Sequence, residues 1–332
     1  MKILITGAAG FLARDLIIFL QKSGHSVLGI DNFSKYLGNS KTDYCQIIEG
    51  DARDEKLLKK HLAGMDCFIP MAAMVGGIDY FHQNPFTIMS HNDALTQSAF
   101  STAIEAHKND SLRRIVLISS SMVFENASPD QMQETSIDGI ASPSSSYGFQ
   151  KLNIEKYAEF AWQQFRLPCE VIRPFNGVGI GELQDLPIAW LKTKQGLPTG
   201  LHVIPDLILK SMLQEKALKI YGSGDQVRCF TSSKDIAIGV QKILARQFDQ
   251  LRYYHLSSEI PTSIMELASL IWSIVRPDEK FILENSPSYP WDVKKRIPVT
   301  TETKQLLEFS AQEKLPDMIQ EIHKFILKEG LG

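Results

Sequence analysis

The chain has 332 residues, of which 44% are hydrophobic and 22% are charged, and its formal net charge at pH 7 is -3. This length and composition allow a large buried core and predict one domain with a smaller companion. The small net charge argues against nucleic acid or a membrane surface as a partner.

The cysteines and histidines show no grouped pattern. The four cysteines are Cys45, Cys67, Cys169 and Cys229, with no C-x-x-C pair, which is typical of reduced thiols and predicts a cytoplasmic protein. The eight histidines include no H-x-x-x-H, so we expect no metal site. A strand is predicted from Lys2 and no apolar run approaches the length of a membrane span, so we expect neither a signal peptide nor a membrane helix.

The first predicted strand, Ile3 to Thr6, runs directly into the small residues Gly7, Gly10 and Ala13. Glycines at such a turn let the backbone lie close to a pyrophosphate, and the helix that follows directs its first N–H groups at the phosphates. The spacing is G-x-x-G-x-x-A instead of the standard G-x-G-x-x-G. A tight turn that binds no ligand would use the same glycines, so that alternative stays open.

The second predicted strand, Ser26 to Ile30, ends at Asp31. A carboxylate at this place can accept hydrogen bonds from ribose hydroxyls and repels a 2′-phosphate, so it favours NAD over NADP. A solvated acid at the end of a strand is the alternative. Strand, glycines, helix, strand and acid follow in the order of a nucleotide-binding unit, and we therefore predict NAD as the cofactor.

Short apolar strands and helical stretches alternate through the first half of the chain. The further strands are predicted at Cys45 to Glu49, Cys67 to Met71, Arg114 to Ser119 and Cys169 to Arg173. This alternation predicts an α/β fold with a Rossmann-type doubly wound parallel sheet, which binds ligands beyond the carboxyl ends of its strands.

After Pro174 the pattern loosens, because prolines and glycines interrupt short helices, as is typical of a region that covers a substrate. Tyr253 to Ser257 is predicted as one more strand that returns to the sheet. We expect an NAD-binding domain at residues 1–175, to which residues 226–260 return, and a smaller, mixed substrate-binding domain at residues 176–225 and 261–332.

Tyr147 and Lys151 form a Tyr-x-x-x-Lys pair. Four residues apart on a helix, they share a face, so the Lys151 ammonium would lower the pKa of the Tyr147 phenol and make it a usable base. The serine run Ser119 to Ser121 follows an apolar strand, where a hydroxyl can bond the substrate oxygen that Tyr147 deprotonates. Such pairs also occur in ordinary helices, and serines also cap turns.

The chain resembles, over nearly its whole length, the extended short-chain dehydrogenase/reductase family, specifically its NAD-dependent sugar-nucleotide epimerases and dehydratases. TGAAGFLA at Thr6 to Ala13 is similar to the family's T-G-x-x-G-x-x-G/A, and GDARD at Gly50 to Asp54 is similar to its adenine-contacting G-D-x-R-D. SSSMVF at Ser119 to Phe124 resembles S-S-x-x-V-Y, which implies that Ser120 is the catalytic serine beside Tyr147 and Lys151.

The resemblance also implies which residues contact the cofactor. They are Gly7, Gly10, Phe11, Leu12, Asp31, Asn32, Asp51, Ala52, Ala72, Ala73, Tyr147, Lys151 and Pro174.

Three later segments imply a site for a nucleoside diphosphate. VIRPFNGVGIG resembles R-P-x-N-x-Y-G-P-G, whose asparagine, here Asn176, touches a substrate phosphate. GSGDQVRCF resembles G-x-G-x-x-x-R-x-F and implies a phosphate-binding role for Arg228, and YPWDVKKR ends in Arg296, which is similar to an arginine that reaches the diphosphate. Arginine suits this task because its guanidinium offers paired donors in a fixed geometry. Either arginine alone could instead be a surface cation.

The implied substrate contacts come from several segments of the chain. They are Gly76, Gly77, Ser121, Asn176, His202, Val203, Tyr221, Arg228 and Arg296. Leu218, Ile220 and Tyr221 are expected to flank the base, and apolar stacking accepts purines and pyrimidines alike.

Departures from the family pattern narrow the expected reaction. MAAMVGGI at Met71 to Ile78 resembles a loop of GDP-mannose 3,5-epimerase and GDP-fucose synthase, and His202 resembles the histidine acid of the latter. Met122 stands where those relatives have a cysteine acid/base, and Ser121 and Met122 stand where 4,6-dehydratases have Asp and Glu. A thioether cannot transfer protons. The chain thus has the residues for hydride transfer, but it has neither the cysteine nor the Asp-Glu pair with which those relatives remove a proton from carbon.

We therefore expect an NAD-dependent epimerase that inverts C4 of a nucleoside-diphosphate sugar through a transient 4-keto intermediate. Tyr147 would take the proton of the C4 hydroxyl while C4 hydride passes to NAD, and the keto sugar would turn before hydride returns. The alternatives are a GDP-linked keto-sugar 3,5-epimerase or epimerase/reductase, and a non-enzymatic NAD-binding regulator. The family resemblance further implies a homodimer formed through helices near Asn92 to His107 and Tyr147 to Phe165.

Overall fold

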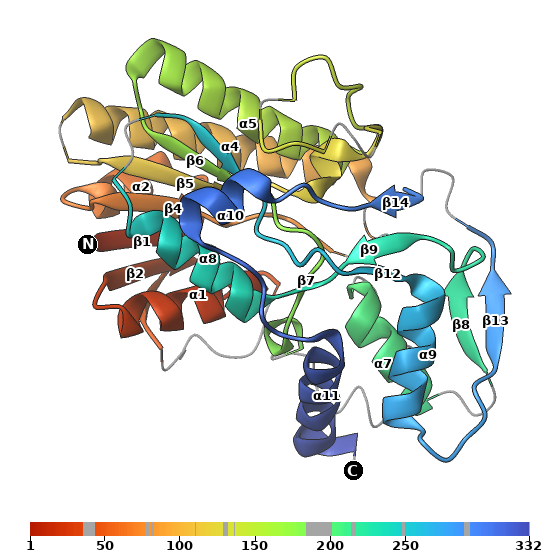
Figure 1. The fold of residues 1–332 in the computed structure, drawn as a ribbon. Helices are drawn as coiled ribbons and strands as arrows, with labels where there is room; N and C mark the ends of the chain where they lie inside the picture. The colour runs from red at the N-terminus through yellow and green to blue at the C-terminus, as the bar shows by residue number, and fades with distance from the viewer. Residues whose placement is uncertain are drawn as a thin grey trace.

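The computed structural model has a parallel sheet with helices on both faces, and a smaller lobe beyond the carboxyl ends of the strands (Figure 1). It describes residues 1–35, 44–76, 80, 83–109, 111–128, 132–135, 137–183, 201–213, 217–247, 250–288 and 293–331.

In the described part of the chain, the large sheet has seven strands in the order β11-β6-β5-β4-β1-β2-β3, and all neighbouring strands are parallel. They are β1 (Lys2–Thr6), β2 (Ser26–Asp31), β3 (Gln46–Glu49), β4 (Cys67–Pro70), β5 (Arg114–Ile118), β6 (Cys169–Ile172) and β11 (Arg252–Tyr254). The predicted Rossmann-type sheet is confirmed. Because the strand order reverses between β1 and β4, the loops that follow these strands diverge and leave a crevice.

Helices cover both faces of the sheet (Figure 1). The helices α1 (Phe11–Lys22), α8 (Ser233–Leu244) and α10 (Thr301–Leu307) pack together, and α2 (Glu55–Leu62), α4 (Pro85–Lys108) and α5 (Ser146–Phe165) form a second group. In α1 the buried residues Ala13, Leu16, Ile17 and Leu20 recur at the spacing of one helix face, which explains why this segment is an amphipathic helix against the sheet.

The smaller lobe contains three helices and short strands in the described residues. They are α7 (Val203–Leu213), β8 (Leu218–Tyr221), β9 (Val227–Cys229), β12 (Pro261–Ser263), α9 (Ile264–Val275), β13 (Leu283–Ser286), β14 (Lys295–Arg296) and α11 (Leu315–Ile326). β8 pairs with β13, and β9 lies between β12 and β14. α9 begins with a capping box in which Ser263 and Glu266 bond each other's backbone N–H groups.

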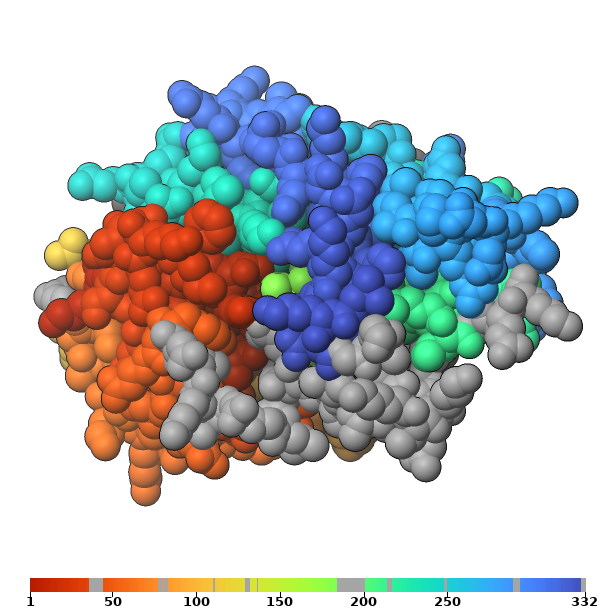
Figure 2. Space-filling view, turned by 90° about the horizontal axis from the view of Figure 1, so that it is seen from below, coloured from red at the N-terminus to blue at the C-terminus, as the bar shows by residue number. Residues whose placement is uncertain are grey.

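The lobe has a core of its own, built around the buried side chains Ile208, Leu218, Trp272 and Ile319. Residues after β14 contribute to the cores of both parts. Leu307 packs with residues of α1 and α8 beside the large sheet, and Ile319 of α11 packs in the core of the smaller lobe. Figure 2 shows α11 on the surface between the N-terminal part of the chain and the lobe that contains α7 and α9.

Short elements join the two parts and surround the cleft. They are β7 (Gly177–Val178), β10 (Thr231–Ser232), and the 3-10 helices η1 (Ser121–Phe124) and η3 (Ile180–Glu182). β7 pairs with β10. Among the described helices, none has the length and apolar character needed to cross a membrane.

Candidate active site

A cleft of about 1200 Å³ runs along the carboxyl edge of the sheet and under the smaller lobe. It is lined by the predicted cofactor, catalytic and substrate residues that lie in the described part of the chain, with one exception. Leu218, which was expected to flank the base, is fully buried in the core of the smaller lobe, whereas Ile220 and Tyr221 line the cleft. Gly77 is outside the described residues. The structure therefore brings together residues that the sequence places as far apart as Gly7 and Arg296.

At one end of the cleft, the glycine turn connects β1 to α1. Gly7 has a φ of 69°, in the left-handed region, and a Cβ added to it would lie 2.7 Å from the backbone nitrogen of Ala72. Only glycine fits this close approach of two loops. Gly10 is the N-cap of α1 and provides no side-chain acceptor, so the first N–H groups of the helix are available to an anion in the cleft. This arrangement fits a pyrophosphate.

Asp31 is held beside the same turn. Its Oδ2 accepts a hydrogen bond from the Ala9 N–H at 2.9 Å, and its Oδ1 accepts one from the Phe33 N–H at 2.8 Å. Each carboxylate oxygen can accept more than one hydrogen bond, so the group can still bind ribose hydroxyls. Further along the cleft, Arg53 pairs with Asp51 and lowers the pKa of that carboxyl.

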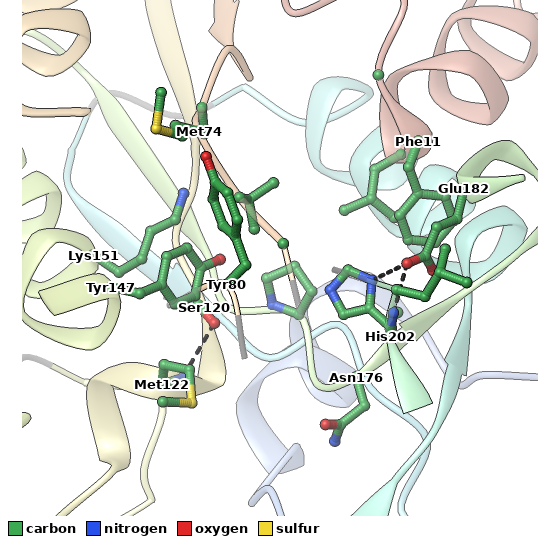
Figure 3. A pocket seen from close by; sticks show the side chains of 18 of the residues that line it. Phe11, Met74, Tyr80, Ser120, Met122, Tyr147, Lys151, Asn176, Glu182 and His202 are labelled. Atoms are coloured by element: carbon green, nitrogen blue, oxygen red, sulfur yellow. Dashed lines mark hydrogen bonds and ion pairs between the residues drawn. The ribbon is translucent and has the colours of Figure 1, made fainter. Parts of the chain in front are cut away.

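The predicted catalytic residues lie on one wall of the cleft (Figure 3). α5 begins at the N-cap Ser145, whose Oγ accepts a hydrogen bond from the Gly148 N–H at 3.0 Å. This cap fixes the first turn, which carries Tyr147, and Lys151 follows one turn later. Ser120 is the N-cap of η1, and its hydroxyl hydrogen-bonds the Tyr147 side chain.

The expected acidification of Tyr147 is wrong for this arrangement. Burial raises the pKa of Tyr147, and the hydrogen bond from Ser120 and the charge of Arg296 only partly oppose this effect. Burial also lowers the pKa of Lys151 to about 8, although the Glu155 carboxylate acts to raise it. The Lys151 Nζ donates to the Ile118 carbonyl at 2.8 Å and lies 5.7 Å from the centre of the Tyr147 ring. Desolvation of the phenol therefore outweighs the effects of Ser120 and Arg296 on its pKa, and Lys151 is not among the groups that lower this pKa.

A buried ion pair lies beneath this wall. The Arg173 guanidinium donates to the two carboxylate oxygens of Glu155, from Nε at 2.9 Å and from Nη2 at 2.7 Å, and both side chains are fully buried. The Ser119 hydroxyl donates to the same carboxylate at 2.5 Å. Glu155 is one helical turn after Lys151, so this network joins the ends of β5 and β6 to the catalytic helix.

His202 faces the predicted catalytic residues from the other side of the cleft (Figure 3). Its Nδ1 lies 2.8 Å from Oε1 of the buried Glu182, which also accepts a hydrogen bond from the His202 N–H at 2.6 Å. Attraction to Glu182 raises the pKa of His202. Burial acts to raise the pKa of Glu182, but its interactions with His202 bring the net shift below the ordinary value. The pair therefore favours a protonated imidazole.

The smaller lobe contributes two neighbouring cations. Arg228 on β9 and Arg296 on β14 are partners in the register of parallel strands, and they are only 9% and 6% exposed. Both line the cleft. Asn176 lies nearby in the left-handed region with a φ of 40°, and its Nδ2 donates to the Cys229 carbonyl at 3.0 Å. Two arginines that line the same cleft from neighbouring strands suit a ligand with more than one negative charge.

Several cleft residues carry no motif in the sequence. Asn92 fixes Met74, since its Oδ1 accepts from the Met74 N–H at 2.7 Å and its Nδ2 donates to the Met74 carbonyl at 3.0 Å. Asn92 is itself buried and acts on the cleft through Met74, whereas Tyr80 and Glu125 line the cleft directly. Glu182 directly follows the glycines of VIRPFNGVGIG, so its position offered a signal, whereas the other residues reach the cleft only through the tertiary fold. Among the described residues there is no cluster of His, Cys, Asp and Glu that could hold a metal ion.

The sequence profile of the NAD dependent epimerase/dehydratase family matches residues 3–255. The chain belongs to this family. A Bacillus subtilis protein described as an uncharacterized UDP-glucose epimerase is 28% identical over 332 residues, covering 96% of this chain and 95% of its own. The family is that of the extended short-chain dehydrogenases/reductases predicted above, so the chain is an NAD-dependent enzyme, and the glycine turn and Asp31 fit that cofactor.

Solved structures show the same fold. UDP-glucose 4-epimerase from Thermotoga maritima with UDP-glucose has a TM-score of 0.81 at 19% identity, over 99% of both chains. UDP-glucuronic acid 4-epimerase from Bacillus cereus, in complex with UDP-glucuronic acid and NAD, has a TM-score of 0.75 at 24% identity, also over 99% of both chains. These likenesses extend over the whole chain, so the fold described above is the fold of these enzymes.

Proposed function

We propose that the chain is an epimerase that inverts C4 of a nucleoside-diphosphate sugar. The observation that carries this proposal is the distribution of groups in one cleft. Ser120 and Tyr147 lie near the cofactor end, and the buried pair Arg228 and Arg296 lies under the smaller lobe. A sugar attached to a diphosphate fits both sets of residues, since its hydroxyls suit Ser120 and Tyr147 and its phosphates suit the two arginines. NAD, when bound, supplies a reversible hydride acceptor.

The residues of the chain then act as follows. Arg228 and Arg296 hold the diphosphate, so that the sugar keeps its attachment while the ring is free to turn. Tyr147 removes the proton of the C4 hydroxyl, and Ser120, which already bonds the phenol, holds the C4 oxygen. Once the C4 centre is a ketone, the ring can present its other face before Tyr147 returns the proton.

The experiment is conversion of UDP-glucose to UDP-galactose by purified protein, compared with Tyr147→Phe. We expect the substitution to abolish turnover while the purified variant still carries NAD. Tyr157→Phe is a matched control, because Tyr157 lies on the same helix and is 36% exposed. Equal turnover by Tyr147→Phe and by the unsubstituted protein would contradict the proposed role of the phenol.

One observation favours a second candidate function. The interaction with Glu182 raises the pKa of His202 and so favours its protonated form in the cleft, which suits a general acid. The second candidate is therefore a GDP-linked keto-sugar 3,5-epimerase or epimerase/reductase. Net consumption of NADH or NADPH with a GDP-linked keto sugar would identify the reductase, since a 4-epimerase regenerates its cofactor in each turnover.

We also propose that the enzyme is a homodimer formed through α4 and α5. These helices carry large exposed apolar side chains, with Phe86 82%, Phe149 42% and Phe160 60% exposed. Exposed aromatic groups of this size are typical of protein interfaces. Light scattering tests the proposal, and a monomer at micromolar concentration would contradict it.

A further inference from the structure

The wall of the cleft beside Ser120 and Tyr147 carries a carboxylate that the proposed reaction does not use. Glu125 directly follows η1, is only 8% exposed, and lines the cleft together with Met122. Its Oε2 accepts a hydrogen bond from the Ser145 N–H at 2.8 Å. Since Ser145 is the N-cap of the helix that carries Tyr147, this bond places the carboxylate next to the predicted site of proton transfer.

The segment that holds Glu125 is fixed against α5. The Asn126 Nδ2 donates to the Ser142 carbonyl at 2.7 Å and to the Ser144 Oγ at 2.9 Å. A Cβ added to Gly148 would lie 2.9 Å from the Met122 carbonyl oxygen, so η1 and the first turn of α5 are in close contact. The position of the Glu125 carboxylate is therefore set by the fold.

One oxygen of this carboxylate remains available to a ligand. Oε1 accepts no hydrogen bond from any described residue, and Glu125 forms no ion pair within the described part of the chain. The buried Oγ of Ser146, on the same wall, has no hydrogen-bond partner among the described residues either. Groups of this kind in a binding cleft are satisfied by a polar ligand.

We propose that Glu125 selects the sugar by its charge. Oε1 accepts a hydrogen bond from a hydroxyl of a neutral hexose, and the carboxylate repels a uronic acid, because two carboxylates cannot donate to each other and carry like charges. The neighbouring Met122 offers no donor that would compensate a second carboxylate. This inference rests on the proposed function and assigns a neutral sugar nucleotide, rather than a uronate, as its substrate.

The experiment measures the dissociation constants of UDP, UDP-glucose and UDP-glucuronate by calorimetry with the NAD-loaded protein. We expect UDP-glucose to bind at least about tenfold more tightly than UDP-glucuronate, a difference of about 1.4 kcal/mol. Glu125→Gln keeps an oxygen for the Ser145 N–H and removes the charge, so it should reduce this ratio about tenfold, mainly through tighter binding of UDP-glucuronate. Binding of UDP should not change.

Two further variants make the result specific. Glu105→Gln removes a carboxylate that is 55% exposed and outside the cleft, and it should leave the ratio unchanged. If Glu125→Gln lowers the melting temperature, Glu125→Ala serves as the second test. A loss of packing alone would weaken the binding of UDP-glucose and of UDP-glucuronate equally and would leave their ratio unchanged.

A protein that binds UDP-glucuronate as tightly as UDP-glucose, or binds neither more tightly than UDP, would overturn the inference. An unchanged ratio in both Glu125 variants would also overturn it. The proposed function fails separately: if the binding ratio changes as expected but no UDP-galactose is formed, the inference stands and the assignment of C4 epimerisation is wrong.

Discussion

Replacing Glu155 with leucine should test whether the buried ion pair beneath the catalytic wall supports the fold. The substitution removes the two carboxylate oxygens that accept from the Arg173 guanidinium at 2.9 and 2.7 Å, and it leaves a fully buried charge without its counter-ion. Removing one partner of such a pair costs about 3–5 kcal/mol. Because Arg173 also donates to the Gln133 and Thr135 carbonyls, at 3.0 and 2.9 Å, we expect a loss near 3 kcal/mol, at the lower end of about 3–5.

Urea unfolding at neutral pH measures this loss, and a double-mutant cycle isolates the pair. Glu155→Leu combined with Arg173→Met should cost less than the sum of the two single losses, because the double variant leaves no unpaired charge. Glu279→Leu is a control, since Glu279 is 53% exposed in its pair with Arg276, and it should have a much smaller effect. A loss below about 1 kcal/mol for Glu155→Leu, or strict additivity, would refute the reasoning.

Three other substitutions test separate features of the site. Gly7→Ala should lower the melting temperature and the NAD content, because its Cβ would lie 2.7 Å from the Ala72 nitrogen at a φ of 69°, and unchanged values would contradict this reading of the turn. Burial lowers the pKa of Lys151 from 10.5 to about 8, so between these pH values the unfolded chain binds more protons than the folded protein. The unfolding free energy should therefore rise from pH 8 to pH 10.5 by up to about 3 kcal/mol relative to Lys151→Met. A difference between the two proteins that does not change with pH would show that Lys151 has an ordinary pKa. Glu182 raises the pKa of His202, so the pair contributes its full stability only below about pH 6.5, the pKa of an unfolded histidine. The loss of unfolding free energy caused by Glu182→Gln, measured in urea, should therefore shrink as the pH rises through the raised pKa of His202. A loss that grows with pH would be inconsistent with the pair.

Much of the fold follows from local sequence patterns. The strands β1 and β2 are short apolar runs bounded by turn residues, and Gly7 identifies the turn between β1 and α1 because only glycine fits there. Cleft residues that belong to a family motif can likewise be predicted from the sequence, because a motif keeps its residue types at fixed spacing. The strand predicted at Tyr253 to Ser257 does return to the sheet, since β11 (Arg252–Tyr254) pairs with β6.

Other parts of the site depend on contacts between distant segments. Glu125 is held in the cleft by its hydrogen bond from the Ser145 N–H, and neither residue belongs to a sequence pattern that predicts this contact. The predicted lowering of the Tyr147 pKa is wrong because helical spacing shows that Tyr147 and Lys151 share a face but does not show that both groups are buried. Burial is a property of the assembled core, and the sign of the Tyr147 shift follows from it.

The register of β9 and β14 sets two like charges beside each other in a nearly dry part of the smaller lobe. An anion bound by both Arg228 and Arg296 would contact the two strands at once. A diphosphate held as proposed would therefore also act as a cross-link between β9 and β14, so that binding of the substrate would stabilise this sheet of the smaller lobe.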